Sequence, residues 1–542
     1  MVDANRIRSI TVNQIGYPQE GRKLAVFTAE GSFQVREAAS GSLIHLGATQ
    51  PLAYDEASGQ AVAFGDFSAV NQPGRYYIEL EASKARSAVF TIAASPYEDV
   101  HLGLLKAFYY YRCGTELTEE FAGPWAHGAC HLADGTIHGD PSRSQDGCGG
   151  WHDAGDYGKY AGPGAKAVAD LLLAFECYPG AFRKPVPLPE TDGFMPDVLH
   201  ECRYELNWLF KMQDLVSGGV YHKLTTPHFP PLATRPEDDL SPLVFSPISA
   251  TATGCFAGVM AMAARVYRPY DEPFALRCLQ AAEGAWAWLR EHPDVPGFKN
   301  PPDISTGEYG DKQDIDERYW AACELYRTTG QSVYHEALQA YSREDFYKYG
   351  LGWADMSGYG TIAYLLGGDD QADPALYASL LDGLRQEADL LTVQSEQDGY
   401  GLSLLPSQYI WGSNMLVMNH AMLLLFAYRL LADRRYEEAA LSHVHYLLGR
   451  NAMDTSYVTG FGDQAYRNPH YRPGVADDIE EPVPGFVSGG PNAGLQDECA
   501  KAHLTGKPPA QCFIDHEDSY ATNEVTIYWN SPALFVVSHW VR

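Results

Sequence analysis

The hydrophobic periodicity of the chain changes near Pro96, and this change limits the possible architecture more than any other feature. Before it, short runs such as SFQVRE (32–37) lie between turn residues, which is typical of β-strands. After it, apolar residues recur at intervals of three and four, as in Leu199, Cys202 and Leu206, which is typical of amphipathic helices. We therefore predict a multidomain chain with an N-terminal all-β sandwich and a following all-α domain.

The individual elements follow from the same patterns. Strands are expected at 22–27, 32–37, 60–67, 74–80 and 87–92. Helices are expected within 196–214 and 279–292, and around 162–177, 249–268, 314–329, 357–366, 374–392, 411–432, 434–449 and 529–541, with little strand between them. We place the sandwich at 1–93 and the helical domain at 94–542.

Four loops between the predicted helices are much longer than usual. They cover 114–150, 214–247, 295–312 and 451–523 and are rich in Gly, Pro and Asp. Loops of this length are usually functional. We therefore expect a helical scaffold whose long loops carry the site.

Composition narrows the class of ligand. Acidic residues outnumber basic ones 69 to 39, for a net charge of -30, which argues against nucleic acid or an anionic membrane as a partner. Aromatic residues make up 12% of the chain, and their flat apolar faces and polar edges suit sugar rings. No run of about 18 apolar residues predicts a membrane span.

The cellular location and the oligomeric state are predicted from weaker sequence signals. The start of the chain, MVDANRIRSITVNQ, has no apolar core of a secretory signal, and ten cysteines in 542 residues are sparse. We expect a cytoplasmic monomer acting on short oligosaccharides, with a secreted protein that has lost its leader as the alternative.

The stretch GGWHDAGDYGKY (149–160) places two aspartates, Asp153 and Asp156, between glycines just before a predicted helix. Two carboxylates at this spacing can hold one water, with one orienting it and the other taking its proton. The structural alternative is a helix N-cap and a turn aspartate.

A glycoside hydrolase also needs a proton donor for the leaving oxygen, and in an inverting enzyme it lies about 6.5–9.5 Å from the base. Glu524 is a candidate, because it precedes the apolar helix predicted near the C-terminus. Neighbouring Tyr520, Tyr528 and Trp529 offer an apolar setting that would raise its pKa. A solvated or capping glutamate is the alternative.

Four segments, in this order, resemble the signature segments of the glycoside hydrolase family 9 cellulases: GGWHDAGDYGKY, RNPHYRPG (467–474), VSGGPNAG (487–494) and TNEVTIYWNSPALF (522–535). The segment VNQIGYPQEGRKLAVF (12–27) resembles the immunoglobulin-like module that precedes the catalytic domain in one subgroup. Together they span nearly the whole chain.

The resemblance implies an (α/α)6 barrel that cleaves β-1,4-glucosidic bonds with inversion, in cellulose, cello-oligosaccharides or related β-glucans. By the family pattern Asp156 is the general base, Asp153 helps to hold the attacking water, and Glu524 is the general acid.

The resemblance also implies substrate contacts. His470 and Arg472 match positions that hydrogen-bond the sugar, whereas Tyr471 stands where many relatives have a second histidine. Trp411 could form a stacking platform or pack in the core, and Tyr520 is a further candidate for substrate binding.

Two cysteines and two histidines offer the donor set that zinc prefers: Cys113, Cys130, His131 and His152. Their spacing is not that of a zinc finger, so spacing alone leaves coincidence or a disulfide open. The resemblance implies a structural zinc at these residues, adjoining Asp153 through His152.

A structural calcium is also implied by the resemblance, through EYGDKQDIDERYWAACELY (308–326). Asp316 and Glu317 would be ligands, completed by Asp355, because hard oxygen donors suit this ion. An acidic helix start is the alternative. Asp477 and Glu480 are weaker candidates for a second calcium.

We expect endo action. The alternatives are an exo-acting cellodextrinase, an exo-β-glucosaminidase or, from a different class, a non-catalytic carbohydrate-binding protein.

Overall fold

The computed structural model describes residues 7–368 and 372–542. The chain forms two compact units. Unit 1 contains 1–107, 388–471 and 479–542, and unit 2 contains 108–387 and 472–478. Unit 1 therefore combines the N-terminal strands with the C-terminal third of the helical region.

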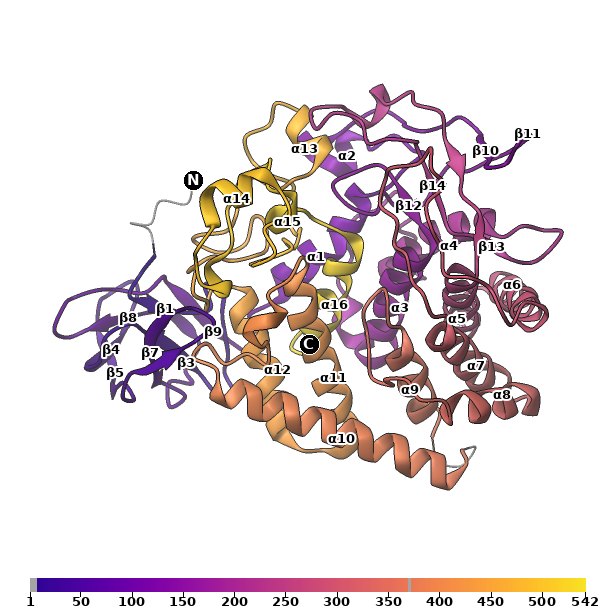
Figure 1. Cartoon of the computed structure of the whole chain (residues 1–542). Coiled ribbons are helices and arrows are strands. Elements are labelled where there is room, and N and C mark those ends of the chain that lie inside the picture. The colour runs from indigo at the N-terminus through magenta and orange to yellow at the C-terminus, as the bar shows by residue number, and fades with distance from the viewer. Residues whose placement is uncertain (1–6, 369–371) are drawn as a thin grey trace. The chain divides into compact units, whose positions relative to one another are not determined.

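The N-terminal strands of unit 1 form two sheets, shown in indigo in Figure 1. The first contains β1 (Ile10–Thr11), β3 (Leu24–Phe27), β7 (Gln60–Asp66) and β6 (Ala53–Asp55), in this spatial order. The second contains β2 (Gly16–Pro18), β9 (Phe90–Ala93), β8 (Gly74–Leu80), β4 (Ser32–Glu37) and β5 (Leu43–Ala48). Alternation along β4 buries Phe33 and Val35 in a core shared with Phe27 and Phe67.

The helical part of unit 1 packs α11 (Ser413–Leu431), α12 (Arg434–Leu447) and α16 (Ile527–Ser538) against one another. The sandwich joins it through buried polar contacts. The Asn13 amide lies 3.0 Å from His445 Nδ1, and the Gln14 amide donates to the Asp454 carbonyl at 2.9 Å. Buried hydrogen bonds of this kind fix the register of two surfaces more than apolar contacts do.

Helix α11 is the one described helix with the length and apolar composition of a membrane span. However, 67% of that window is buried inside the protein, and core helices of soluble proteins have the same properties.

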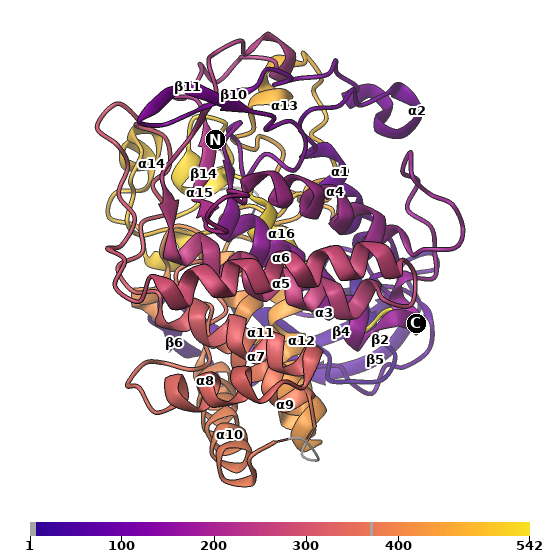
Figure 2. The ribbon, with the colours of Figure 1, turned by 90° about the vertical axis from the view of Figure 1, so that its right-hand side faces the viewer.

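Unit 2 is built from consecutive packed helices, which Figure 2 shows side by side. They are α3 (Ala161–Cys177), α4 (Asp197–Met212), α5 (Ala250–Tyr267), α6 (Glu272–Glu291), α7 (Ile315–Thr329), α8 (Ser332–Ser342) and α9 (Ser357–Leu366). Helix α5 is buried along nearly its whole length between α3, α6 and α7. Two helices, α1 (Glu98–Tyr110) and α10 (Pro374–Gln397), run across the boundaries between the units.

The loops of unit 2 contain more strand than the sequence pattern predicts. β11 (Asp140–Gln145), β10 (Gly135–Ile137), β15 (Val244–Phe245), β14 (Lys223–Thr225) and β12 (Lys159–Tyr160) form one small sheet. β13 (Val220–Tyr221) pairs with β16 (Ile248–Ser249). Most of these strands are two or three residues long, which is too short to show a period. Strand β12 leads directly from the acidic segment into α3.

Candidate active site

Asp153 and Asp156 lie in a tight turn of unit 2 between His152 and strand β12. The Asp153 amide donates to the Gly158 carbonyl at 2.9 Å, which closes the turn. Both side chains are buried, at 1% and 7% exposure. Oδ1 of each carboxyl group has no hydrogen-bond partner among the described residues. Two buried carboxyl oxygens therefore remain available to a water or a substrate.

Burial shapes the protonation of this pair. It raises the pKa of Asp156 to about 6, although the charges of Arg472 and Lys223 oppose it. It raises the pKa of Asp153 well above the usual range, and the charge of Asp156 adds to the effect. A carboxyl group with a pKa of about 6 can accept a proton efficiently near neutral pH.

Arg472 forms hydrogen bonds with the backbone of the turn that contains Asp153 and Asp156. Its backbone amide and its Nη1 both donate to the Gly155 carbonyl, at 3.2 and 2.8 Å, and its Nε donates to the Pro230 carbonyl at 3.1 Å. The structure thus uses Arg472 to position the turn and to supply charge near Asp156. Its sugar contact stays a prediction.

Glu524 belongs to unit 1, at the junction between α15 (Tyr520–Asn523) and α16. It is half-buried, and its backbone carbonyl accepts from the Gly489 amide at 3.0 Å. Glu524 also forms a parallel β-bridge with His470, whose amide donates to the Asn523 carbonyl at 2.9 Å. Three of the segments quoted above therefore meet at Glu524.

Three rings form a row beside Glu524. The Trp411 and Tyr520 rings lie 5.2 Å apart, and the His470 and Tyr520 rings 5.9 Å apart. Trp411 is 41% exposed, so it does not pack in the core. The charge of Glu524 contributes to the raised pKa of Tyr520, whose main cause is burial. This row can offer flat faces to sugar rings.

Unit 2 also brings together the four predicted zinc donors. One ligand atom from each of Cys113, Cys130, His131 and His152 lies within 4.8 Å of the others, and all four residues are buried. All ten cysteines are free, so Cys113 and Cys130 form no disulfide. The chain segments that carry Cys113 and His152 are joined by the His152 amide, which donates to the Tyr111 carbonyl at 2.7 Å.

Two of the four donors, Cys113 and His152, are in the protonation state that binds a metal, whereas hydrogen bonds with Asp239 and Cys113 outweigh burial and raise the pKa of His131 to about 9. Burial opposes ionisation of Cys113, but a hydrogen bond from Cys130 and the charge of Lys159 outweigh it and lower its pKa well below the usual range. Burial lowers the pKa of His152 to about 4, so its imidazole is neutral. His131 Nε2 faces the Asp239 carboxylate at 3.4 Å, an arrangement that often orients a metal-binding histidine.

A second group of donors consists of Asp311, Asp316 and Glu317, whose oxygens lie within 4.8 Å of one another. Asp311 Oδ2 and Glu317 Oε2 are buried without a hydrogen-bond partner among the residues that the structure describes. Burial raises the pKa of Asp316 to about 6, and it raises the pKa of Glu317 well above the usual range. Three acidic groups so close together, two of them buried, are the chemistry that a hard cation stabilises.

The other predicted metal ligands lie outside these two groups. Asp355 Oδ1 accepts from the Ser357 hydroxyl at 2.6 Å, although its charge helps to raise the pKa of Asp316. Glu480 forms an ion pair with Arg467 at 3.8 Å, and neither Glu480 nor Asp477 joins a described donor group. A second calcium there stays a prediction.

Two residues of the site, Tyr309 and Asp311, were not predicted from the sequence. Tyr309 donates to Asp153 Oδ2 at 2.5 Å, and Asp311 joins the acidic group. Both lie in EYGDKQD, within the segment predicted to bind calcium. The sequence signal that could have indicated them is the acidic, Gly-containing loop before α7.

Comparison with known proteins decides the family. The model described as "Glycosyl hydrolase family 9" matches residues 97–537, and the model described as "Cellulase N-terminal ig-like domain" matches residues 6–85. The chain belongs to glycosyl hydrolase family 9. The expected β-sandwich followed by a helical domain is therefore confirmed, while the boundary between residues 93 and 94 stays a prediction.

Relatives within family 9 cover nearly the whole chain. A cellodextrinase of Butyrivibrio fibrisolvens is 39% identical over 98% of this chain and 99% of its own length. Endoglucanase D of Acetivibrio thermocellus is 34% identical over 98% of this chain and 83% of its own. The crystal structure of a single mutant of a thermostable endoglucanase from Alicyclobacillus acidocaldarius superposes with a TM-score of 0.94, at 43% identity over 99% of this chain and 100% of that one.

Membership of family 9 makes the chain a glycoside hydrolase. This decides between the two classes of function expected from the sequence, an enzyme and a non-catalytic binding protein, in favour of the enzyme.

Proposed function

We propose that this enzyme hydrolyses β-1,4-glucosidic bonds with inversion. Asp156 acts as the base, Asp153 holds the attacking water, and Glu524 is the acid. The observation that carries the proposal is the pair of buried aspartates with unpartnered Oδ1 atoms and raised pKa values. A surface turn with a capping aspartate would show neither property.

In the proposed step, a water held by Asp153 loses a proton to Asp156 and its oxygen attacks the anomeric carbon. Glu524 gives its proton to the glycosidic oxygen as the bond to that oxygen breaks, so the leaving chain departs as an alcohol. Asp156 ends protonated and Glu524 ionised, and exchange with solvent restores both groups. General acid and base catalysis of this kind contribute about 10²–10⁴-fold each.

For the substrate we propose β-1,4-glucan chains cut internally. An endoglucanase and a cellodextrinase are both among the relatives, which supports the bond type for either mode of action. The exposed Trp411 and the half-buried Tyr520 favour endo action, because stacking faces open to solvent can receive a chain along its length. Exo release from cello-oligosaccharides is the second candidate, supported by the cellodextrinase at 39% identity.

Product analysis tests both parts of this proposal. Cellohexaose should give several product lengths from the start, and NMR of fresh products should show the α-anomer first. A single short product would favour the exo mode, and an initial β-anomer would contradict inversion. Chitosan oligomers offered in parallel test the glucosaminide alternative.

Glu524→Gln tests the acid. We expect kcat on cellohexaose to fall by about 10²–10⁴-fold, with a smaller loss on an aryl cellobioside whose leaving group needs no proton. Glu498→Gln, an exposed glutamate of unit 1, is the matched control. Wild-type turnover by Glu524→Gln would remove Glu524 from the mechanism.

We propose that Cys113, Cys130, His131 and His152 hold a structural zinc. Two thiols, two imidazoles and full burial are typical of closed tetrahedral sites, in which donors lie about 3.3–3.8 Å apart for bonds of about 2.0–2.3 Å. A zinc ion there would supply cross-linking of the chain next to Asp153.

We propose that Asp311, Asp316 and Glu317 hold a structural calcium, with Asp355 as a further ligand. Calcium would supply the positive charge that these carboxyl groups lack.

We propose in addition that the protein is a monomer of the cytoplasm, where its ten free cysteines would stay reduced. Gel filtration and cell fractionation test these last two points.

A further inference from the structure

The loop at residues 306–308 leads directly into Tyr309, whose hydroxyl donates to Asp153. Tyr309 has a left-handed backbone, with a φ of 45°. A strained backbone of this kind persists only where its surroundings hold it. The contacts that fix the loop before Tyr309 therefore bear on the reaction.

Lys223 lies on β14 and contacts this loop with its ammonium group. Its Nζ donates to the Gly307 carbonyl at 2.6 Å and to Thr306 Oγ1 at 3.1 Å. The residue is buried, at 0% exposure. A buried ammonium group must find its acceptors within the protein, so these contacts are not exchanged for water.

His222, the preceding residue, holds the next carbonyl group of the loop. Its Nε2 donates to the Glu308 carbonyl at 3.1 Å, and its Nδ1 accepts from the Ser249 hydroxyl at 2.9 Å. A carbonyl group only accepts, so these partners assign the proton to Nε2. The imidazole also stacks on the Phe298 ring at a centroid distance of 3.7 Å. Two adjacent side chains thus fix consecutive carbonyl groups just before Tyr309.

Strand pairing places Lys223 close to the acidic turn. Strand β14 pairs antiparallel with β12, and Lys223 lies opposite Tyr160. Lys223 Nζ is 5.5 Å from the centre of the Tyr160 ring, and that ring lies 4.6 Å from the Tyr309 ring. Lys223 therefore contacts both the loop and the strand that follows the two aspartates.

The charge of Lys223 also acts on Asp156. Burial lowers the pKa of Lys223 to about 8, against the opposing charges of Asp156 and Glu308, so the ammonium group is protonated at neutral pH. Burial is the main cause of the raised pKa of Asp156, and the charges of Arg472 and Lys223 oppose it. Asp153 is the other ionisable neighbour, and burial together with the charge of Asp156 raises its pKa well above the usual range.

We propose that Lys223 is a positioning residue for the hydrolysis. With His222 it fastens residues 306–308, so that Tyr309 keeps its hydroxyl on Asp153, and its positive charge supports Asp156. It acts through these groups and not by contact with the glucan. This inference rests on the proposed roles of the two aspartates.

Lys223→Met removes the charge and the donors while it keeps nearly the length of the side chain. We expect kcat on cellohexaose, measured above the acidic limb, to fall by about 2–10-fold, the loss of about one hydrogen bond, with little change in KM. The acidic limb of kcat/KM should move to higher pH, because the carboxylate form of Asp156 loses a favourable charge. Steady-state kinetics across the pH range measure both effects.

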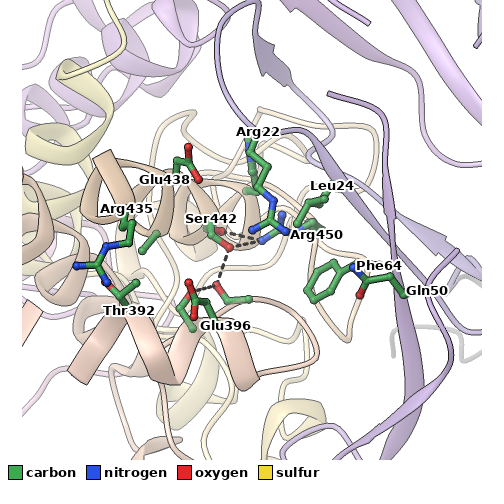
Figure 3. A pocket seen from close by; sticks show the side chains of 14 residues that line it. Arg22, Leu24, Gln50, Phe64, Thr392, Glu396, Arg435, Glu438, Ser442 and Arg450 are labelled. Atoms are coloured by element: carbon green, nitrogen blue, oxygen red, sulfur yellow. Dashed lines mark hydrogen bonds between the residues drawn. The ribbon is translucent and has the colours of Figure 1, made fainter. Parts of the chain in front are cut away.

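Arg450→Met is the matched control. Arg450 is also a buried cation, at 1% exposure, and it donates to the Tyr400 carbonyl at 3.0 Å and to Ser442 Oγ at 2.5 Å. It belongs to unit 1, where Figure 3 shows it beside Ser442 at a cavity. Its loss should lower Tm but leave kcat per folded enzyme and the acidic limb unchanged. Equal losses of kcat in the two variants would overturn the proposal.

A double-mutant cycle tests whether Lys223 acts through Tyr309. The variant with both Lys223→Met and Tyr309→Phe should keep the kcat of Tyr309→Phe within about twofold, because one shared contact is lost only once. Losses that multiply would overturn the proposal. If Lys223→Met does not fold, Thr306→Val takes its place in the cycle, because it keeps the charge and removes a hydroxyl partner of Nζ. A wild-type kcat in Thr306→Val would equally overturn the proposal.

Arg472→Met separates this inference from the proposed function. If the acidic limb moves in Arg472→Met but stays in place in Lys223→Met, Asp156 is the base and the role of Lys223 is refuted. If the limb moves in neither variant, the assignment of the base fails, and the inference about Lys223 fails with it.

Discussion

The Tyr309 hydroxyl donates a hydrogen bond to Oδ2 of Asp153 over 2.5 Å, and Tyr309 holds this position with a φ of 45°. A tyrosine in the left-handed region is strained, so its surroundings must fix it. The Tyr160 and Trp353 rings do so, at centroid distances of 4.6 and 4.9 Å. The hydrogen bond leaves Oδ1 of Asp153 as the oxygen that can hold the water.

Tyr309→Phe keeps the ring packing and removes only this hydrogen bond. We expect kcat to fall by about 2–10-fold, because a hydrogen bond contributes about 0.5–1.5 kcal/mol, while KM and Tm change little. Steady-state kinetics and thermal unfolding measure the two effects. An unchanged kcat would show that Asp153 needs no such orientation.

The pH dependence of activity should report Asp156. A base must be ionised to accept a proton, so kcat/KM should be full above the pKa of about 6 and be lost as the pH falls through it. The charge of Arg472 lowers this pKa, so Arg472→Met should move the acidic limb to higher pH. Arg467→Met, in the same segment but exposed and paired with Glu481, should leave the limb in place. If the acidic limb of kcat/KM lies at the same pH in Arg472→Met as in the wild type, the base is a group other than Asp156.

Zinc should be lost from Cys113→Ser. We expect elemental analysis to find one zinc per wild-type chain and none in the variant, whose stability should fall by more than about 4 kcal/mol. Activity should fall as well, because His152 precedes Asp153 in the acidic turn. Cys148→Ser, at a nearby cysteine outside the donor group, should keep both zinc and activity. Full zinc content in Cys113→Ser would refute the ligand set.

Calcium removal should lower Tm, and Asp311→Asn should weaken calcium binding by at least about tenfold through loss of one charged ligand. Competition with a fluorescent chelator measures the affinity. Asp314→Asn is the control, since Asp314 pairs with Arg318 at 2.9 Å and lies outside the donor group. Asp355→Asn, measured alongside, tests whether Asp355 completes the shell. Equal affinities in the wild type and Asp311→Asn would argue against the site.

Much of the fold follows from periodicity. Strands at 32–37 and 74–80 and the helix at 357–366 have the predicted bounds. The strand at 32–37 shows the clearest cause, because Phe33 and Val35 alternate with more exposed residues. Strand β5 was missed because it lies at a sheet edge and buries none of its residues. Helix α8 was missed because it buries only Tyr334 and Leu338, which is too narrow a stripe to show a clear period.

The site was less predictable than the fold. The quoted segments indicated Asp153, Asp156 and Glu524 because each lies in a long, recognisable stretch. Asp311 and Tyr309 depend on how the loop before α7 folds back, which no spacing shows. Arg472 illustrates a further limit, because the sequence shows an arginine but not that its guanidinium donates hydrogen bonds to the Gly155 and Pro230 carbonyls.

Unit 1 joins residues 1–107 to residues beyond 387, and this has a consequence for biosynthesis. The sandwich leaves the ribosome first, but His445 and Asp454, to which Asn13 and Gln14 bind, are translated more than four hundred residues later. The nascent sandwich must therefore wait with this polar surface exposed while all of the intervening unit is made. A truncated polypeptide that ends before α12 would leave that surface permanently uncovered, so chaperones or proteases could bind it.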